Sequence, residues 1–383
     1  MSTRVARAYA TITRMSKTYD VAVIGAGVFG AWTAYSLRRA GSEVLLIDAY
    51  GPANSRASSG GESRMIRLGY GPDEIYTRWS QRSLVLWKQL FQDAGTVSLF
   101  QNTGILWLAR EQDAYCEAVL TTLQRVGARF EKLNRDELVH RFPQIDPGQT
   151  TWAILEPDSG VLLARRAVHA VVARAHKIGV DYQQARVTAD SRINAERLVF
   201  ACGPWLPKLF PQLLGELIHV TRQEVLFFGV PAGDERFGPS AMPAWIDFND
   251  LVYGLPSLDG RGFKLAIDAH GPEFDPDTGV RVISSEGLTA ARSYLARRIP
   301  SLAGAPVLET RVCQYENTSN GDFLIDRHPE FENIWIVGGG SGHGFKHGPA
   351  VGEYVTAMIN GTGAPEPRFS LATKQKVRSR QVY

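Results

Sequence analysis

YDVAVIGAGVFGAWTAYSLRRAGSEVLLID, residues 19–48, is the stretch that decides the fold class of this chain. Residues 21–24 are wholly apolar, which is typical of a buried parallel strand. A helical pattern follows over residues 31–40 and stops at a glycine, the usual residue just past a helix end. A second apolar run, residues 44–47, ends at Asp48. The stretch therefore predicts a β-α-β unit.

A G-x-G-x-x-G motif joins the first strand of this unit to its helix. Gly25 permits the tight turn, Gly27 lets the backbone approach a pyrophosphate, and Gly30 allows the helix to pack closely on the strand. The helix N-terminus offers unpaired N–H groups to the phosphates. A carboxylate at Asp48 is placed to accept the ribose hydroxyls. The predicted cofactor contacts of this unit are Gly25, Gly27, Val28, Phe29, Gly30 and Asp48.

The motif alone does not decide between FAD and a nicotinamide dinucleotide, because an acid after the second strand suits both. Its position near the start of a 383-residue chain favours FAD, whose isoalloxazine ring needs a second domain to cover it. The length also predicts two domains, since single hydrophobic cores stop growing near about 250–300 residues.

Composition excludes several classes of protein. Hydrophobic residues make up 44% and charged residues 21%, which is ordinary for a soluble globular protein. A net charge of +3 is too small to indicate a nucleic-acid partner, and no apolar run is long enough to span a membrane. Three cysteines do not make a disulfide framework, which predicts a cytoplasmic protein. We expect no metal site.

The first residues differ in composition from the rest. From Met1 to Tyr19 there is no acidic residue, a composition faintly like that of an organellar transit peptide. An upstream start codon with the true start at Met15 is a further alternative. Because the first fold-forming strand begins only at about Asp20, we interpret residues 1–18 as a disordered extension.

The periodicity of apolar residues continues along the chain. It predicts helices over residues 74–91, 113–123, 165–178, 285–298 and 349–359, and strands over residues 104–109, 198–201, 223–230, 262–267 and 334–337. These elements predict an α/β (α+β overall) protein, in which a discontinuous Rossmann-like FAD-binding domain is interleaved with an antiparallel-sheet substrate domain. The FAD-binding domain is expected over residues 19–83, 151–218 and 320–383, and the substrate domain over residues 84–150 and 219–319.

Two later strands also end in glycine-rich turns. The strand at 198–201 runs into Cys202-Gly203, and the strand at 334–337 runs into the glycine-rich segment 338–344. Cofactors bind outside the carboxyl ends of parallel strands. A helix N-terminus directed at the flavin would stabilise the negative charge of a reduced ring. Gly342, His343, Gly344 and Lys346 are further predicted cofactor contacts.

Six motifs, in this order, resemble the monomeric sarcosine oxidase and N-methyltryptophan oxidase group of the D-amino-acid-oxidase superfamily. They lie at residues 25–30, 63–67, 262–265, 313–315, 323–329 and 341–346. The resemblance runs from about Tyr19 to the C-terminal region and is looser between Arg165 and Gly203. It implies an FAD enzyme, a flavoprotein that acts on the C–N bond of amines.

The resemblance also implies a role for seven residues. Cys313 matches the cysteine that bonds covalently to the flavin, and Lys264 matches the lysine that activates dioxygen. Arg67 and Lys346 match the pair that binds the substrate carboxylate. Arg64 matches an arginine close to the flavin ring, while Tyr315 and Tyr253 fall where aromatic side chains line the pocket.

Each assignment has a plainer alternative. Arg67 and Lys346 would hold a carboxylate, one by a planar fork and one as a point charge, but charged residues are usually solvated surface groups. A cation at Lys264 would stabilise superoxide, although an alternating strand would also direct this residue outward. Cys313 could be a small buried hydrophobe.

Two positions depart from the sarcosine oxidase pattern. Asp268 stands where those enzymes have a histidine four residues after the oxygen-activating lysine. Gly60 stands where they have a histidine four residues before the first arginine of the motif. An acid in place of a histidine changes the local charge, so we do not expect sarcosine itself to be the substrate.

The sequence thus predicts FAD-dependent oxidation of the C–N bond of a small, secondary or N-methyl amino acid to an imine, with O2 reduced to H2O2. The alternatives are a flavin dehydrogenase with another electron acceptor, an oxidase of primary or cyclic amino acids, and a non-catalytic flavin-binding sensor. The expected partners are a small carboxylate-bearing amine and O2. We expect a monomer that binds neither nucleic acid nor membrane.

Overall fold

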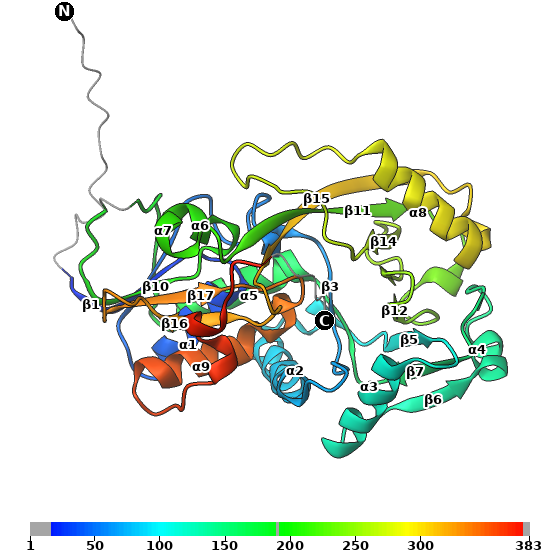
Figure 1. Cartoon of the computed structure of the whole chain (residues 1–383), viewed down its shortest axis with the longest axis horizontal. Helices are drawn as coiled ribbons and strands as arrows, with labels where there is room; N and C mark the ends of the chain where they lie inside the picture. The colour runs from blue at the N-terminus through cyan, green and yellow to red at the C-terminus, as the bar shows by residue number, and fades with distance from the viewer. Residues whose placement is uncertain (1–16, 189–190, 378–383) are drawn as a thin grey trace, which may run out of the picture.

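The computed structural model describes residues 17–188 and 191–377, and within these residues six strands form a mostly parallel sheet, called here the first sheet (Figure 1). Its order is β16-β17-β10-β1-β2-β9; β16 runs antiparallel to β17 and the other pairs are parallel. The strands are β1 Tyr19–Ile24, β2 Val44–Asp48, β9 Asp181–Gln184, β10 Ala195–Phe200, β16 Leu324–Arg327 and β17 Ile334–Gly338. Parallel strands are covered on both faces, which explains the continuous apolar runs in β1 and β2.

Helices of the first sheet come from distant parts of the chain. Helix α1 (Val28–Arg39) packs against α5 (Ala164–Lys177) and α9 (Gly348–Ile359), and α2 (Glu74–Ala94) packs against α9 (Figure 1). The rings of Trp32 on α1 and Trp87 on α2 meet edge to face, with centroids 5.0 Å apart. The helix expected over residues 31–40 begins earlier, directly after Gly27, so its N-terminus lies at the glycine motif.

A second sheet of eight described strands carries the other half of the molecule, in the order β15-β11-β14-β13-β12-β5-β7-β6. Its neighbours pair antiparallel, as expected, except that β5 and β12 are parallel. The strands are β5 Ile105–Ala109, β6 Glu131–Asn134, β7 Trp152–Glu156, β11 His219–Phe228, β12 Ala244–Asp247, β13 Val252–Leu255, β14 Phe263–Ile267 and β15 Val307–Asn317.

Helix α8 (Ser285–Arg298) covers one face of the second sheet (Figure 1). Tyr294 on this helix stacks on Trp245 of β12, with ring centroids 5.5 Å apart. Phe263 and Leu265 of β14 are buried in the same apolar cluster. One face of β14 is therefore core, which leaves alternate residues of the strand for the opposite face.

The remaining elements lie outside the two large sheets. A three-stranded sheet is made of β3 Arg64–Ile66, β8 Gly160–Leu162 and β4 Phe100–Gln101. The other α-helices are α3 Ala114–Arg125, α4 Arg135–Arg141, α6 Leu206–Leu209 and α7 Pro211–Leu214. The 3-10 helices are η1 Ser58–Gly60, η2 Val97–Leu99, η3 Gly203–Trp205, η4 Glu235–Phe237, η5 Pro300–Leu302, η6 Gly344–His347, η7 Pro367–Phe369 and η8 Leu371–Thr373.

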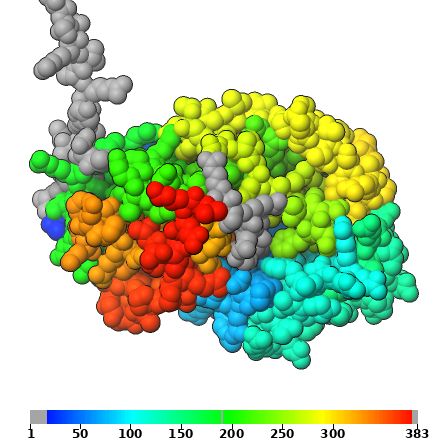
Figure 2. Space-filling model, in the orientation of Figure 1, coloured from blue at the N-terminus to red at the C-terminus, as the bar shows by residue number. Residues whose placement is uncertain are grey.

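The α/β fold class is confirmed, and the expected division into domains stays a proposal. Strand β7 pairs within the second sheet, so the boundary proposed at residue 151 is better placed after β7. In the space-filling view both regions form one body, with residues of about 270–300 (yellow) across the top (Figure 2). Among the described residues, no helix is long and apolar enough to cross a membrane.

We expected an N-terminal extension over residues 1–18. Residues 1–16 of it lie outside the residues that the structure describes. Residues 17 and 18 are part of the fold. The Lys17 Nζ atom lies 2.9 Å from the Asp181 carboxylate and 2.8 Å from that of Glu43. Residues 17 and 18, which we had assigned to the extension, therefore belong to the folded part of the chain.

Candidate active site

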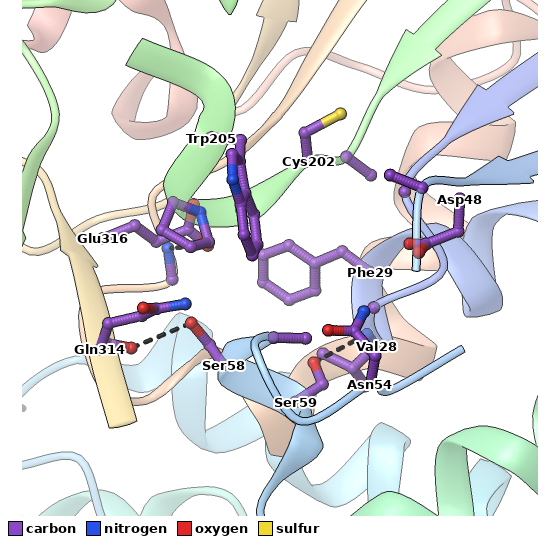
Figure 3. A pocket seen from close by; sticks show the side chains of 18 of the residues that line it. Val28, Phe29, Asp48, Asn54, Ser58, Ser59, Cys202, Trp205, Gln314 and Glu316 are labelled. Atoms are coloured by element: carbon purple, nitrogen blue, oxygen red, sulfur yellow. Dashed lines mark hydrogen bonds between the residues drawn. The ribbon is translucent and has the colours of Figure 1, made fainter. Parts of the chain in front are cut away.

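A cavity of about 390 Å³ lies at the carboxyl ends of β1, β2, β10 and β17 in the first sheet. Ligands of open α/β sheets bind at this edge. Figure 3 shows Asp48 and Asn54 on one side of this cavity, and Gln314 and Glu316 on the other. We call it the cofactor cavity. All of the cofactor contacts that the sequence predicts in the glycine motif line it, except Gly30.

Gly30 acts behind the wall of the cofactor cavity. A Cβ atom added at Gly30 would lie 1.8 Å from the Gly25 carbonyl oxygen, so any larger residue would push α1 away from the turn. Gly25 itself has φ of 105°, a conformation that favours glycine. The backbone N–H of Val28 donates to the Ser59 Oγ atom at 3.0 Å (Figure 3). Close backbone packing behind the turn of residues 25–30 therefore leaves the side of the turn that faces the cavity free for a ligand.

Asp48 holds the loop that follows β2. Its carboxylate accepts hydrogen bonds from the backbone N–H groups of Ala26, at 2.7 Å, Tyr50, at 2.8 Å, and Gly51, at 2.9 Å. Burial raises the pKa of the Asp48 carboxyl, while these backbone donors act in the opposite direction. The side chain lines the cavity as predicted, and its contact with a ribose stays a prediction.

Glu316 is a buried acid on the cofactor cavity that sequence reasoning missed. Burial raises the pKa of its carboxyl to about 7. Its Oε1 atom accepts from the Gly340 N–H at 3.3 Å, whereas its Oε2 atom has no partner among the described residues. Glu316 follows Tyr315 directly on β15. An acidic residue in a strand beside a predicted site motif was the signal that could have identified it from the sequence.

The residues around the cofactor cavity fit FAD. A buried carboxyl oxygen without a partner indicates a polar ligand, because buried polar groups are normally hydrogen-bonded. The backbone at Gly27 leaves room for a pyrophosphate, since an added Cβ would approach nothing closer than the Ser59 Oγ atom at 3.4 Å. Trp205, which sequence reasoning did not single out, lines the same cavity (Figure 3).

A second cavity, of about 80 Å³, adjoins the first and is called here the substrate cavity. Residues that line both cavities mark where they meet: Arg64, Cys313, Tyr315, Gly342 and Phe345. The substrate cavity is further lined by Arg67, Lys346, Tyr253 and Asp268. The structure therefore brings most of the predicted catalytic residues to one place beside the cofactor cavity.

Arg67 and Lys346 are each only 5% exposed, which excludes the alternative of two solvated surface cations. The Arg67 guanidinium lies 4.0 Å from the centroid of the Tyr70 ring and 5.0 Å from that of Trp107. The Lys346 Nζ atom donates to the Tyr70 Oη atom at 2.7 Å and to the His343 carbonyl oxygen at 2.9 Å. Burial, and then the charge of Arg67, hold the pKa of Lys346 well below its usual range.

Lys264 is 2% exposed, so it is not the outward residue of its strand. Its Nζ atom donates to the Ser63 carbonyl oxygen at 2.8 Å and lies 5.7 Å from the centroid of the Tyr253 ring. It lines a separate space of about 10 Å³ and neither the cofactor cavity nor the substrate cavity. Burial, and then the charge of Arg64, lower the pKa of Lys264 strongly.

Cys313 lies at the junction of the two cavities and is 6% exposed. Its Sγ atom is 3.5 Å from an Nη atom of Arg64, which also donates to the Ser58 carbonyl oxygen at 2.7 Å. The junction is a suitable position for a flavin-linked thiol. The covalent link itself stays a prediction.

The Tyr315 hydroxyl donates to an oxygen of the Asp268 carboxylate at 2.8 Å. Burial is the main cause that raises the pKa of both Tyr315 and Tyr253, and the charge of Asp268 adds to it. Asp268 therefore places a negative charge on the same small cavity as the cations of Arg67 and Lys346. This pairing of a cationic and an anionic end suits a zwitterion.

The predicted residues after β17 divide between the two cavities. Gly342 lines both cavities, Gly344 lines the cofactor cavity, and His343 lines the substrate cavity. Before α9 begins at Gly348, the chain forms the 3-10 helix η6, which the sequence did not predict. The His343 ring lies 3.0 Å through Nε2 from the Gly321 carbonyl oxygen.

Comparison with known proteins extends over nearly the whole chain. The profile of the family described as FAD dependent oxidoreductase (DAO) matches residues 20–358. Monomeric sarcosine oxidase of Bacillus sp. (strain B-0618) is 31% identical over 93% of this chain and 96% of its own. N-methyl-L-tryptophan oxidase of Yersinia pestis (strain Pestoides F) is 29% identical over 92% and 99%. The structure of L-proline dehydrogenase from P. horikoshii superposes with a TM-score of 0.80 at 22% identity, covering 93% and 98%, and shares the fold.

Proposed function

The chain belongs to the FAD dependent oxidoreductase family, and from this premise we propose that it oxidises the C–N bond of a small secondary or N-methyl amino acid to an imine. Dioxygen is reduced to hydrogen peroxide. One observation carries the proposal: two buried basic side chains, Arg67 and Lys346, line a small cavity that adjoins the cofactor cavity. The enzyme relatives leave no support for the sensor alternative.

FAD is held by the cofactor cavity in this proposal. The turn from Gly25 to Gly30 and the N-terminus of α1 hold the pyrophosphate, and Asp48 binds the ribose. Arg64 and Cys313 are the residues that would lie beside the ring, and Cys313 is the residue that would carry a covalent link. When bound, FAD supplies a two-electron acceptor next to the C–N bond of the substrate.

The chain's own residues bind and orient the amine. Arg67 offers a planar pair of donors and Lys346 a point charge, and together they fix the substrate carboxylate. Tyr253 and Tyr315 bound the remaining space, so the carbon next to nitrogen faces the junction of the two cavities. Fixed orientation of this kind removes much of the entropic part of a barrier.

Lys264 has the role of an electrostatic group in the oxygen half-reaction. It lies behind Ser63 and beside Tyr253, away from the walls of the substrate cavity. When it carries a proton, the Lys264 amine acts on a nearby charge more strongly in this buried position than it would in water. We propose that its charge stabilises the superoxide formed when dioxygen takes its first electron.

Gly60 and Asp268 argue against sarcosine as the preferred substrate. A Cβ atom added at Gly60 would lie 2.0 Å from the Asn54 carbonyl oxygen, so the loop has no room for a histidine there. Asp268 supplies an acid that is hydrogen-bonded by Tyr315. A negative charge on Asp268 favours a substrate that binds with a protonated nitrogen and then loses that proton.

Anaerobic mixing of the holoenzyme with a panel of N-methyl, cyclic and primary amino acids tests the proposal. We expect the visible flavin band to bleach with secondary or N-methyl amino acids and not with the corresponding amines that lack a carboxylate. Bleaching by amines without a carboxylate, or by no member of the panel, would overturn the proposed substrate class.

Two further measurements address the finer statements. Under air, a yield of one peroxide per substrate supports an oxidase, and its absence supports the dehydrogenase alternative. Flavin that stays with acid-precipitated protein, and is released in the Cys313→Ser variant, supports the covalent link. We also propose a cytoplasmic monomer, which gel filtration and cell fractionation test.

A further inference from the structure

A fully buried acid, Glu156 at the end of β7, holds the loop that follows β3. The backbone N–H groups of Leu68 and Gly69 in this loop donate to its carboxylate at 2.7 Å and 2.9 Å. The Trp107 indole Nε1 atom donates at 2.8 Å, and the Ser159 hydroxyl donates at 2.5 Å. The proposed function gives this carboxylate no role.

The four donors occupy both oxygens of the Glu156 carboxylate. The Oε1 atom accepts from Gly69 and Trp107, and the Oε2 atom accepts from Leu68 and Ser159. An ionised carboxylate has no donor and offers roughly four lone-pair sites, so this set of donors suits the anion. Because these sites are taken by the protein itself, Glu156 acts through the groups that it holds.

Both groups that the Glu156 Oε1 atom holds are also contacts of Arg67. The Arg67 guanidinium donates through an Nη atom to the Gly69 carbonyl oxygen, and it lies 5.0 Å from the centroid of the Trp107 ring. It also lies 4.0 Å from the centroid of the Tyr70 ring, which belongs to the same loop. One carboxylate oxygen therefore fixes both a carbonyl and a ring that orient Arg67 in the wall of the substrate cavity.

The loop is packed so closely that it depends on these hydrogen bonds. A Cβ atom added at Gly69 would lie 2.8 Å from an atom of the Trp107 ring and 3.0 Å from the Glu156 Oε1 atom. An amide in place of the carboxylate has one acceptor oxygen and a donor NH2 group. Its NH2 group would face one pair of donors, so either Leu68 or Gly69 would lose its acceptor and the loop would shift.

The charge of Glu156 also reaches the other basic residue of the substrate cavity. Burial, and then the charge of Arg67, lower the pKa of Lys346, while the charges of Asp268 and Glu156 act in the opposite direction. A negative charge at Glu156 therefore favours the ammonium form of Lys346, which is the form that binds a carboxylate. The geometric effect on Arg67 and the electrostatic effect on Lys346 thus have the same sign.

Resting on the proposed carboxylate anchor, we propose that Glu156 is a positioning residue for the substrate carboxylate. It holds the Arg67 guanidinium in its binding orientation before the substrate arrives. Within the described part of the chain, Glu156 lines neither the substrate cavity nor the cofactor cavity, so it acts through Arg67 rather than by contact with either ligand. A guanidinium that is already fixed loses little further freedom when a carboxylate binds.

Titration of the holoenzyme with propionate, which has no C–N bond to oxidise, measures carboxylate binding by calorimetry. We expect Glu156→Gln to bind propionate about tenfold more weakly than the wild type, with unchanged flavin content. In turnover, KM for a carboxylate-bearing substrate should rise by a similar factor, while kcat falls less than about twofold. Glu131→Gln, an exposed acid on the neighbouring strand β6, is the matched control and should behave as the wild type.

A double-mutant cycle separates positioning from a general effect on folding. In the Arg67→Leu background, Glu156→Gln should weaken propionate binding by no more than about twofold, the part that acts through the charge of Lys346. Trp107→Phe keeps a ring beside Arg67 but removes one donor to Glu156, so we expect it to weaken binding about threefold. Should Glu156→Gln fold poorly, Trp107→Phe takes its place in the cycle.

Equal weakening by Glu156→Gln with and without Arg67 would overturn the proposal, because the effect would then not pass through Arg67. Unchanged propionate binding in Glu156→Gln, or in Trp107→Phe where that variant replaces it, would overturn it as well. Loss of flavin together with propionate binding would show a general structural role instead. Failure of the wild-type holoenzyme to bind propionate would overturn the carboxylate anchor itself, on which the proposal rests.

Discussion

The cofactor cavity and the substrate cavity are built in different ways. The cofactor cavity is shaped by backbone at the ends of parallel strands, and its first part comes from the contiguous residues 25–30. The substrate cavity is shaped by side chains from segments as far apart as Arg67, Tyr253 and Lys346. The cofactor cavity depends on glycine positions, where the absence of a Cβ atom lets the backbone approach a ligand. The substrate cavity depends on charged side chains that only the tertiary fold brings together.

Because backbone packing shapes the cofactor cavity, we expect the largest effect from Gly30→Val, as a loss of bound FAD. The valine would meet the Gly25 carbonyl oxygen, since even its Cβ atom would lie 1.8 Å away, and the N-terminus of α1 would leave the turn. We expect purified Gly30→Val to carry no FAD, as measured by flavin absorbance per protein. Gly304→Ala, where an added Cβ meets nothing within 4 Å, is the control. Normal flavin content in Gly30→Val would contradict the comparison.

Removing one charge from the substrate cavity should leave FAD in place and weaken the substrate. Truncating one partner of a buried ion pair costs roughly 2–5 kcal/mol. For Arg67→Leu we therefore expect kcat/KM to fall about 30-fold or more, mainly through KM, with unchanged flavin content. Arg67→Lys keeps the charge but not the planar pair of donors, so its kcat/KM should lie between those of the wild type and Arg67→Leu. Loss of FAD in Arg67→Leu would show that the two cavities are not independent.

Glu316 tests whether a side chain in the cofactor cavity acts as an unpaired acid. Its pKa is raised to about 7 in the fold and is about 4.5 when the chain unfolds, so the folded apoprotein binds the extra proton between these values. The free energy of unfolding therefore falls as pH rises from about 4.5 to about 7. The loss is about 3 kcal/mol.

We expect Glu316→Gln to remove this pH dependence, which urea unfolding of the apoprotein would measure. The variant should be more stable than the wild type above about pH 7 and similar to it near pH 4.5. Glu332→Gln, an exposed acid, provides the control and should leave the pH dependence unchanged. A parallel pH dependence in Glu316→Gln and the wild type would contradict the buried-acid interpretation.

The smallest expected effect concerns the anionic end of the substrate cavity. Asp268→His replaces the acid that Tyr315 contacts with the histidine expected from the sarcosine oxidase pattern. We expect kcat/KM for N-methylglycine, relative to the best substrate, to rise about fivefold, or about 1 kcal/mol. Asp268→Asn removes the charge alone and serves as the comparison. If the relative preference is unchanged in both variants, Asp268 does not contribute to the substrate specificity of the enzyme.

The two cavities also differ in how far the sequence predicted them. The β-α-β unit was predicted closely because strand, turn and helix follow one another within residues 19–48. The start of α1 was placed three residues late, since Val28 and Phe29 lie inside the glycine motif and carry no helical period of their own. The short β3, which carries Arg64, gives no periodic signal either.

The polar residues behind the substrate cavity were beyond sequence reasoning. Tyr70 and His347 are 277 positions apart and meet only because α2, the loop after β3 and η6 pack together. Lys264 lines a separate small space behind Ser63, so its predicted place beside the flavin stays a prediction. Cys313 and Glu316 are near neighbours on β15, and only the second shows its role through burial without a partner.

The junction between the two cavities has a consequence for the order of assembly. Arg64, Cys313 and Tyr315 belong to both walls, so a ring seated at the junction becomes the partition between them. Without the ring the two cavities adjoin directly, and a small acid between Arg67 and Lys346 would lack a wall on that side. We therefore expect tight binding of such an acid to require the prosthetic group, so that protein without it is not occupied by substrates that it could not oxidise.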